Sequence, residues 1–153
     1  MLFRSWLLCN HLKSKGFGTP ASNNARRLAQ AKRVREILGR FDLARDFVVV
    51  AGDLNDTPDS APLQPLVSTP NLFDVLASPL LGGPRWTFQT ANEQIDYLLV
   101  SKPLNSRLKK VAIERRGIFN HNNFGGLFPH LPEVTSRVTQ ASDHAAVSAE
   151  FDI

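Results

Sequence analysis

Apolar positions follow a helical period in the first third of the chain. Beyond the capping candidates Ser22 and Asn23, hydrophobic side chains recur three or four residues apart, which is the spacing of one helix face. They are Leu28, Ala31, Val34, Ile37, Leu38 and Phe41. Basic residues such as Arg27 fall between these positions. The pattern predicts an amphipathic helix that covers a sheet, with its arginines on the polar side.

Runs of apolar and β-branched residues predict the strands. Residues 47–51 form an unbroken run that ends in Gly-Asp, the pattern of a strand buried on both faces with a functional loop at its carboxyl end. Other strands are expected over residues 2–9, 85–90, 94–101, 109–115 and 145–151. Prolines at residues 58–65 predict a loop with a short helical segment, residues 72–77 a further short element, and residues 117–141 a long irregular stretch.

Size, charge and cysteine content narrow the class of protein. A length of 153 residues suits a single domain, residues 1–153, with a core of its own. The net charge of +4 and the pI near 9.6 mildly favour a polyanionic partner such as nucleic acid. Cys9 is the only cysteine, which excludes an internal disulfide framework and a CxxC-type metal site.

Targeting and membrane segments are not expected. No apolar run approaches the length of a transmembrane helix. The basic, hydrophobic opening is broken by Arg4 and Ser5, and no small-residue cleavage site follows it. We therefore expect no signal peptide on this chain and a cytoplasmic location by default, with secretion of a longer form left open.

Asp53 and Asn55 are the first candidates for chemistry. They directly follow the buried strand and lie two positions apart, so strand alternation would direct both side chains into one cleft. A carboxylate beside an amide suits Mg²⁺ and phosphate chemistry. An Asx turn is the competing interpretation. An EF-hand loop is disfavoured because Pro58 and Gln64 stand where such a loop needs glycine and glutamate.

Asp143 and His144 precede the last predicted strand. An imidazole beside a carboxylate can act as a general acid or base near neutral pH, or stabilise a phosphate transition state when protonated. A solvated turn is the alternative. Asp96 stands alone in an apolar strand, and because an unpaired buried charge is costly we expect it to contact His144. Backbone amides at a sheet edge could satisfy it instead.

His11 ends the first predicted strand and opens a basic loop containing Lys13 and Lys15. The loop could contact phosphate, but a lone histidine at a strand end is more often structural, and the lysines could simply be solvated.

The order of these motifs is distinctive. His-Leu-Lys-Ser at residues 11–14 is followed by Gly-Asp-Leu-Asn at 52–55, Ile-Asp-Tyr at 95–97 and Ser-Asp-His at 142–144. This order resembles the DNase I-like endonuclease/exonuclease/phosphatase family, with an extension after Asn55 similar to that of bacterial nuclease-like members. The resemblance runs from about Trp6 to Phe151.

The resemblance implies an α+β fold, the DNase I-like α/β/β/α sandwich, of which this chain would be the carboxyl-terminal portion. It also implies Mg²⁺ or Mn²⁺ as cofactor and an active site at one end of the packed sheets. By motif matching, the catalytic residues would be His11, Asp53, Asn55, Asp96 and His144. The metal ligands would be Asp53, Asn55 and Asp143.

The implied reaction is hydrolysis of a phosphodiester bond, with nucleic acid the favoured substrate, by in-line attack of an activated water. The general base stays open among Asp53, His11 and His144. A phosphomonoesterase or a sphingomyelinase-like phospholipase of the same family is the alternative.

One departure from the family pattern bears on activity. An asparagine on the first strand and a metal-binding glutamate in the amino-terminal half of such proteins have no counterpart here. The chain would then be part of a longer enzyme, would receive the missing half-domain from a partner, or would be a non-catalytic interaction domain. An exposed sheet edge would also favour self-association.

Overall fold

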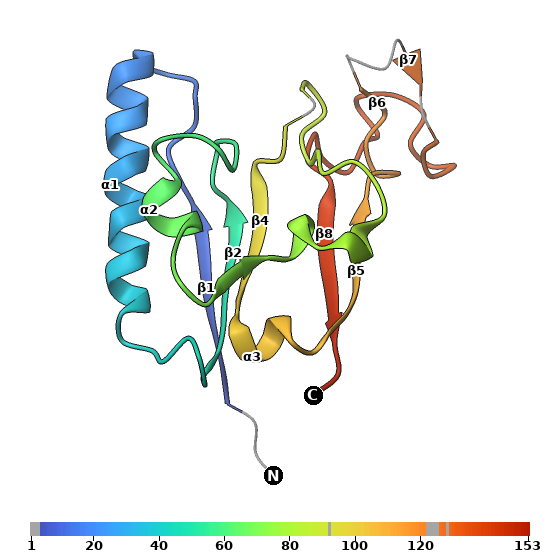
Figure 1. Cartoon of the computed structure of the whole chain (residues 1–153). Coiled ribbons are helices and arrows are strands. Elements are labelled where there is room, and N and C mark those ends of the chain that lie inside the picture. The colour runs from blue at the N-terminus through green and yellow to red at the C-terminus, as the bar shows by residue number, and fades with distance from the viewer. Residues whose placement is uncertain (1–3, 92, 122–125, 128) are drawn as a thin grey trace.

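Helix α1 (Pro20–Leu38) lies along the first sheet in the computed structural model, which describes residues 4–91, 93–121, 126–127 and 129–153 (Figure 1). The Thr19 side chain accepts a hydrogen bond from the Ser22 amide, and the Ser22 side chain bonds back to the Thr19 backbone. With Pro20 at the first helical position, the helix begins before the predicted start at Ser22.

The first sheet contains four strands in the order β1-β2-β4-β3. They are β1 (Ser5–His11), β2 (Phe47–Asp53), β3 (Leu72–Asp74) and β4 (Asp96–Ser101). Strands β1 and β2 are parallel, whereas β4 is antiparallel to both β2 and β3. The strand predicted over residues 2–9 corresponds to β1. Residues 2–3 lie outside the described residues, and β1 continues to His11.

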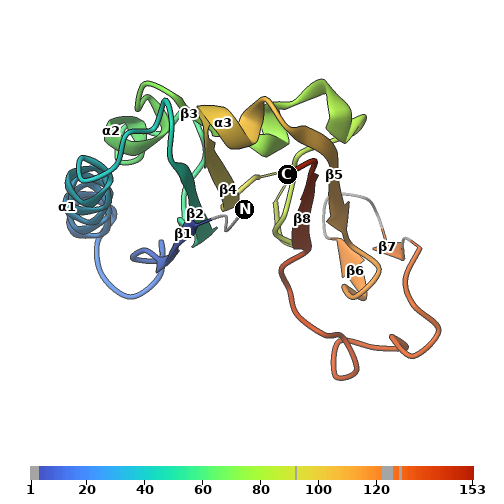
Figure 2. The same ribbon diagram turned by 90° about the horizontal axis from the view of Figure 1, so that it is seen from below.

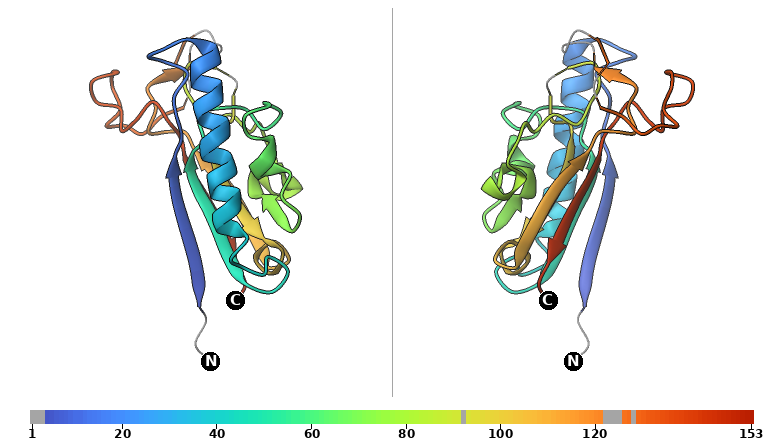
Figure 3. Two further views of the ribbon diagram at one scale, coloured as in Figure 1. Left: turned by 90° about the vertical axis from the view of Figure 1, so that its left-hand side faces the viewer. Right: turned by 90° about the vertical axis from the view of Figure 1, so that its right-hand side faces the viewer.

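One face of this sheet carries the main core. Strand alternation directs Val48 and Val50 of β2 and Leu99 of β4 toward α1. There they pack against the helix face formed by Ala31, Val34 and Leu38. Figure 3 shows α1 running alongside β1 and β2. The predicted amphipathic helix on a sheet is thus present.

The opposite face packs against a second sheet, formed by β5 (Leu108–Glu114) and β8 (Ala146–Phe151). Val49 and Leu98 of the first sheet meet Val147 of the second in this inner core. Figure 2 shows α1, the first sheet and the β5–β8 pair in succession, which is an α+β sandwich as expected.

Shorter elements complete the described part of the chain. They are α2 (Gln64–Val67), η1 (Val75–Ala77), η2 (Pro79–Leu81), α3 (Lys102–Asn105), β6 (Asn120–His121) and β7 (Gly126–Leu127). Within the described residues, no helix is both long and apolar enough to cross a membrane.

Two sequence-based expectations about the helices and strands were wrong. Residues 85–90 form no strand; they contribute a single bridge between Phe88 and His144, and a turn begins at Gln89. Arg27 does not lie on the polar side of α1, because its side chain is buried on the face that packs inward.

Candidate active site

Polar side chains form a row across three neighbouring strands at one end of the first sheet. His11 of β1 lies opposite Asp53 of β2, and Asp53 lies opposite Asp96 of β4. Residues opposite each other in a sheet present their side chains on the same face. Alternation from Val49 places Asp53 on the inner face, toward the second sheet. The strand pairing therefore brings together residues far apart in sequence.

Asp53 and Asn55 form an Asx turn at the end of β2. The Asn55 amide donates to Asp53 Oδ1 at 2.8 Å, and Asn55 Nδ2 donates to Asp53 Oδ2 at 3.0 Å. Asn55 has φ 56°, in the left-handed region that asparagine tolerates better than most residues. The two side chains lie together because of this turn, and not because of continued strand alternation.

Asp96 and His144 connect the two sheets. His144 Nδ1 lies 2.9 Å from Asp96 Oδ2, the contact expected from the sequence, and both side chains are largely buried. Thr87 holds the start of β4 in place, since its buried hydroxyl accepts hydrogen bonds from the Ile95 and Asp96 amides. The Phe88 ring packs against the His144 ring, with centroids 5.0 Å apart.

Asp53, Asp96 and His144 could hold a metal ion. Each offers one ligand atom, and these atoms lie within 4.8 Å of one another. Two carboxylates directly opposite each other repel, and a divalent cation would relieve that repulsion. Carboxylate oxygens suit Mg²⁺ or Mn²⁺, whereas an imidazole is a less typical ligand of Mg²⁺. The donor set therefore fits a hard divalent cation held by the two aspartates, with His144 beside it.

The remaining predicted residues lie around this group. His11 Nε2 is 3.7 Å from Asp53 Oδ2, but its side chain is 75% exposed. Asp143 is exposed and is not one of the three residues with clustered ligand atoms in the described part of the chain. Its backbone carbonyl accepts a hydrogen bond from the Gln89 amide at 2.9 Å.

The surroundings shift two protonation equilibria in the cluster. Burial raises the pKa of the Asp53 carboxyl, and the charge of Asp96 acts in the same direction, although the Asn55 amide opposes both. The hydrogen bond with Asp96 raises the pKa of His144, against the effect of burial. Asp53 is thereby a stronger base than an ordinary aspartate, and His144 holds its proton more tightly.

A pocket of about 270 Å³ opens beside the cluster. Asn55, Phe88 and His144 contribute to its lining, and the basic loop contributes Lys15. The pocket thus combines an apolar ring, a polar amide, an imidazole and the ion pair of Lys15 with Glu93. An organic group with polar edges would meet complementary side chains there.

A comparison with protein families confirms the resemblance that the order of motifs suggested. Residues 5–144 match the model of the Endonuclease/Exonuclease/phosphatase family. The chain belongs to this family. A comparison with curated proteins gave no significant match.

Solved structures of the Endonuclease/Exonuclease/phosphatase fold are similar to the chain. An AP endonuclease from Archaeoglobus fulgidus superposes with a TM-score of 0.65 at 17% identity, covering 96% of this chain and 61% of that one. The 3′ phosphatase NExo from Neisseria, bound to a product DNA hairpin, gives 0.61 at 20% identity with the same coverages. Truncated Caenorhabditis elegans TDP2 gives 0.59 at 21%, covering 95% and 53%. This chain therefore spans about 61% of the length of the first two.

Sequence reasoning missed the roles of three residues around the candidate site. Thr87 and Phe88 belong to the segment misread as a strand, and they support Asp96 and His144 through contacts that depend on the folded chain. Lys15 was noted only as part of a basic loop, yet it lines the pocket and contacts Glu93 at 3.0 Å. The sequence feature that could have indicated the role of Lys15 is the cluster of lysines and glycines in the loop after His11.

Proposed function

We propose that this chain carries the metal and phosphate site of a divalent-metal-dependent phosphodiesterase that hydrolyses nucleic acid. The observation that carries the proposal is the cluster of Asp53, Asp96 and His144 beside a pocket that Asn55 and Lys15 also line. Two facing carboxylates, an imidazole and adjacent donor groups suit the hydrolysis of a phosphate ester by water.

The proposed cofactor is Mg²⁺ or Mn²⁺. Asp53 and Asn55 would be its ligands from the end of β2, with Asp96 opposite and Asp143 as a further ligand from the segment before β8. A bound cation would offset charge on the phosphoryl oxygens and the leaving group and make the attacking water more acidic.

The side chains of the site would carry out proton transfer and contact the phosphate. Asp96 engages Nδ1 of His144, which leaves Nε2 free to donate a proton or a hydrogen bond to a phosphate oxygen. The general base would be Asp53, His11 or His144: burial raises the pKa of the Asp53 carboxyl without metal, and a cation bound to it would lower that pKa again. His11 lies beside Asp53 at the exposed rim, where it could contact the phosphate.

Nucleic acid is the proposed substrate because the chain is basic, with a pI near 9.6. The similar Neisseria structure is named a 3′ phosphatase and contains a DNA hairpin, so a phosphomonoester on DNA is the second candidate. A sphingomyelinase-like phospholipase activity is the alternative, and hydrolysis of sphingomyelin would distinguish it.

The test uses the purified chain with Mg²⁺ or Mn²⁺ and four substrates: plasmid DNA, RNA, bis-p-nitrophenyl phosphate and sphingomyelin. We expect hydrolysis of the nucleic acids and the diester, lowered about a hundredfold or more by Asp53→Ala and by His144→Ala. Asp152→Asn is the matched control, since Asp152 is exposed at the far end of β8 and should leave activity unchanged. Activity on sphingomyelin alone would refute the nuclease assignment.

A non-catalytic interaction domain is the remaining possibility. Calorimetric titration with Mn²⁺ distinguishes it from an enzyme. We expect binding by the chain and its loss in Asp53→Ala. If no metal binds and no substrate is hydrolysed, the chain by itself is not an enzyme.

We also propose that further polypeptide covers β1, either a second copy or a partner that supplies additional sheet. In the strand order β1-β2-β4-β3, β1 lies at an edge. Leu7 on this strand is 63% exposed. In Figures 1 and 2, β8 and β5 lie beyond β4 and far from β1. An exposed apolar edge strand favours association with another strand.

A further inference from the structure

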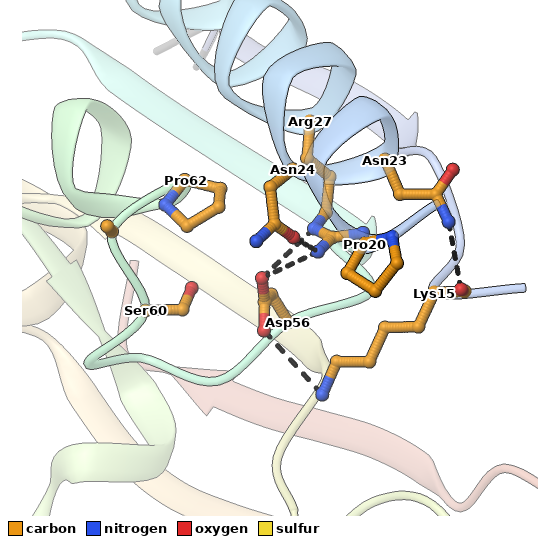
Figure 4. Close-up of a pocket in the computed structure, with 9 residues that line it drawn as sticks. Lys15, Pro20, Asn23, Asn24, Arg27, Asp56, Ser60 and Pro62 are labelled. Atoms are coloured by element: carbon orange, nitrogen blue, oxygen red, sulfur yellow. Dashed lines mark hydrogen bonds and ion pairs between the residues drawn. The ribbon is translucent and has the colours of Figure 1, made fainter. Parts of the chain in front are cut away.

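A second cavity, of about 410 Å³, lies between the first turns of α1 and the loop that follows Asn55 (Figure 4). Its polar lining comes from Lys15, Asn23, Asn24, Arg27, Asp56 and Ser60, and its apolar lining from Pro20, Ala61 and Pro62. Nothing in the proposed hydrolysis uses this cavity. Its volume is in the range of pockets that hold small organic ligands.

The cavity adjoins the candidate active site. Asn55 lines the active-site pocket and the next residue, Asp56, lines the second cavity. Lys15 lines both. One peptide unit and one lysine side chain therefore separate the two spaces, so a substrate longer than a single phosphate group could occupy both.

A buried polar framework fixes the shape of the cavity. The Arg27 side chain is only 2% exposed and pairs with Asp56 Oδ2 through Nε at 3.0 Å and Nη2 at 2.9 Å. Arg27 also donates to the Lys13 carbonyl and to Asn24 Oδ1. A site held by groups locked in this way is largely formed before a ligand binds.

The charges around the cavity cancel. Arg27 is neutralised by Asp56, and the Lys15 ammonium lies 3.0 Å from Glu93 and 3.6 Å from Asp56. Two cations thus face two carboxylates. This balance disfavours a free phosphate or other anion, and it suits a neutral ligand with polar edges.

Two polar groups in the cavity have no partner among the described residues. Ser60 Oγ is a buried atom without a hydrogen bond. Asn24 uses Oδ1 to accept from Arg27, which leaves its Nδ2 donor for a ligand. Figure 4 shows both groups directed into the space between the helix and the loop. A buried hydroxyl without a partner is costly, and a ligand edge would satisfy it.

We propose that this cavity binds a neutral nucleobase of the nucleotide next to the scissile phosphate, which rests on the proposed nuclease function. The flat base packs against Pro20, Ala61 and Pro62, while Asn24 and Ser60 bond to its polar edge. Lys15 lines both spaces, so the linkage between the two nucleotides would pass beside its side chain.

Binding of fluorescent single-stranded oligothymidylate, measured by anisotropy in EDTA, tests the proposal without any hydrolysis. An abasic oligomer of equal length and charge is the reference ligand. Ala61 is exposed, so Ala61→Trp can place a ring in the cavity without disturbing the core. We expect it to weaken oligothymidylate binding at least about tenfold. Affinity for the abasic oligomer should stay the same.

Ala44→Trp is the matched control. Ala44 is also exposed and lines a different pocket, of about 280 Å³, at the carboxyl end of α1. It should bind both oligomers like the unmodified chain. If Ala61→Trp weakens both oligomers equally, or neither, the cavity does not hold a base.

Ser60→Ala supplies a second, independent readout. Removing a buried hydroxyl that lacks a partner should leave the melting temperature unchanged or raised, and should weaken oligothymidylate binding severalfold. A lower melting temperature with unchanged binding would overturn the proposal. Because no metal is present, this experiment can succeed even if the hydrolysis predicted above is absent, so the two proposals fail separately.

Discussion

The contact between Asp96 and His144 joins the two sheets at the point where both carry polar side chains. Asp96 belongs to β4 and His144 directly precedes the segment leading into β8, yet Nδ1 and Oδ2 lie 2.9 Å apart. The carboxylate fixes which ring nitrogen carries a proton toward it and favours the charged imidazole. The contact between the two sheets and the protonation of His144 therefore depend on each other.

We predict that Asp96→Asn lowers the pKa of His144 toward the ordinary value of about 6.5. The reason is that the hydrogen bond with the Asp96 carboxylate is the main cause raising this pKa. The measurement is an NMR titration of the imidazole in EDTA, so that no metal competes for the site. In concentrated urea, the pKa of His144 should be the same in the unmodified chain and in Asp96→Asn. Equal pKa values for the two chains in buffer would contradict the prediction.

The raised pKa of His144 also makes the stability of the fold depend on pH. A histidine whose pKa is raised by folding stabilises the fold fully below its unfolded pKa, about 6.5. That stabilisation is lost as the pH rises through the pKa of His144 in the folded chain. The difference in unfolding free energy between the chain and Asp96→Asn should therefore be larger at pH 6 than at pH 9, in metal-free buffer.

At the scale of elements, α1 is connected to the loop after β2 by a buried ion pair. Arg27 on the helix and Asp56 in the loop are both nearly inaccessible, with side chains 2% and 10% exposed. Removing one member of such a pair leaves an uncompensated charge, which costs far more than losing a pair on the surface.

Arg27→Met should accordingly lower the unfolding free energy by about 3 kcal/mol. Equilibrium urea unfolding measures this change, and adding Asp56→Asn should recover part of it because the stranded carboxylate is gone. Arg33→Met is the matched control on the same helix. Its pair with Glu36 is 65% exposed on both sides, so the expected change is within about 0.5 kcal/mol. Equal losses in the two arginine variants would contradict a structural role for the buried pair.

The sequence held the information that Arg27 is buried, although its residue type pointed the other way. Arg27 precedes Ala31 by four positions and Asn23 precedes Arg27 by four, so both share the apolar helix face. What the sequence could not supply was the partner, because Asp56 lies 29 residues away. Periodicity predicted the face, and only the fold explains why a charge is tolerated there.

For the strands and the site too, local features could be predicted from the sequence and tertiary contacts could not. Runs of apolar and β-branched residues predicted β2, β4, β5 and β8 closely, since such a run is a local property of the sequence. Residues 85–90 alternate between apolar and polar side chains, but their one bridge partner is His144 and they form no strand. Asp96 was expected to contact His144 because a charge in an apolar strand needs a partner, whereas Thr87 and Phe88 were missed because their roles depend on tertiary contacts.

At the scale of the whole molecule, the two faces of β1 differ. Trp6 lies on the side of α1, with its ring 5.3 Å from that of Phe41. Leu7 points to the inner side and is 63% exposed, and Cys9 on the same side is also exposed. The second sheet covers β2 and β4 through the inner core but not this part of β1.

We therefore predict that the chain self-associates through β1 and that Leu7→Lys shifts it toward the monomer. A lysine on an edge strand keeps other strands away, because pairing would bury its charge without a partner. Sedimentation velocity over a range of concentrations should show concentration-dependent association for the unmodified chain and a smaller effect for the variant. Leu80→Lys is the control, since Leu80 is 50% exposed but lies on η2. A monomer at every concentration, or an equal response to both substitutions, would show that β1 is not the contact surface.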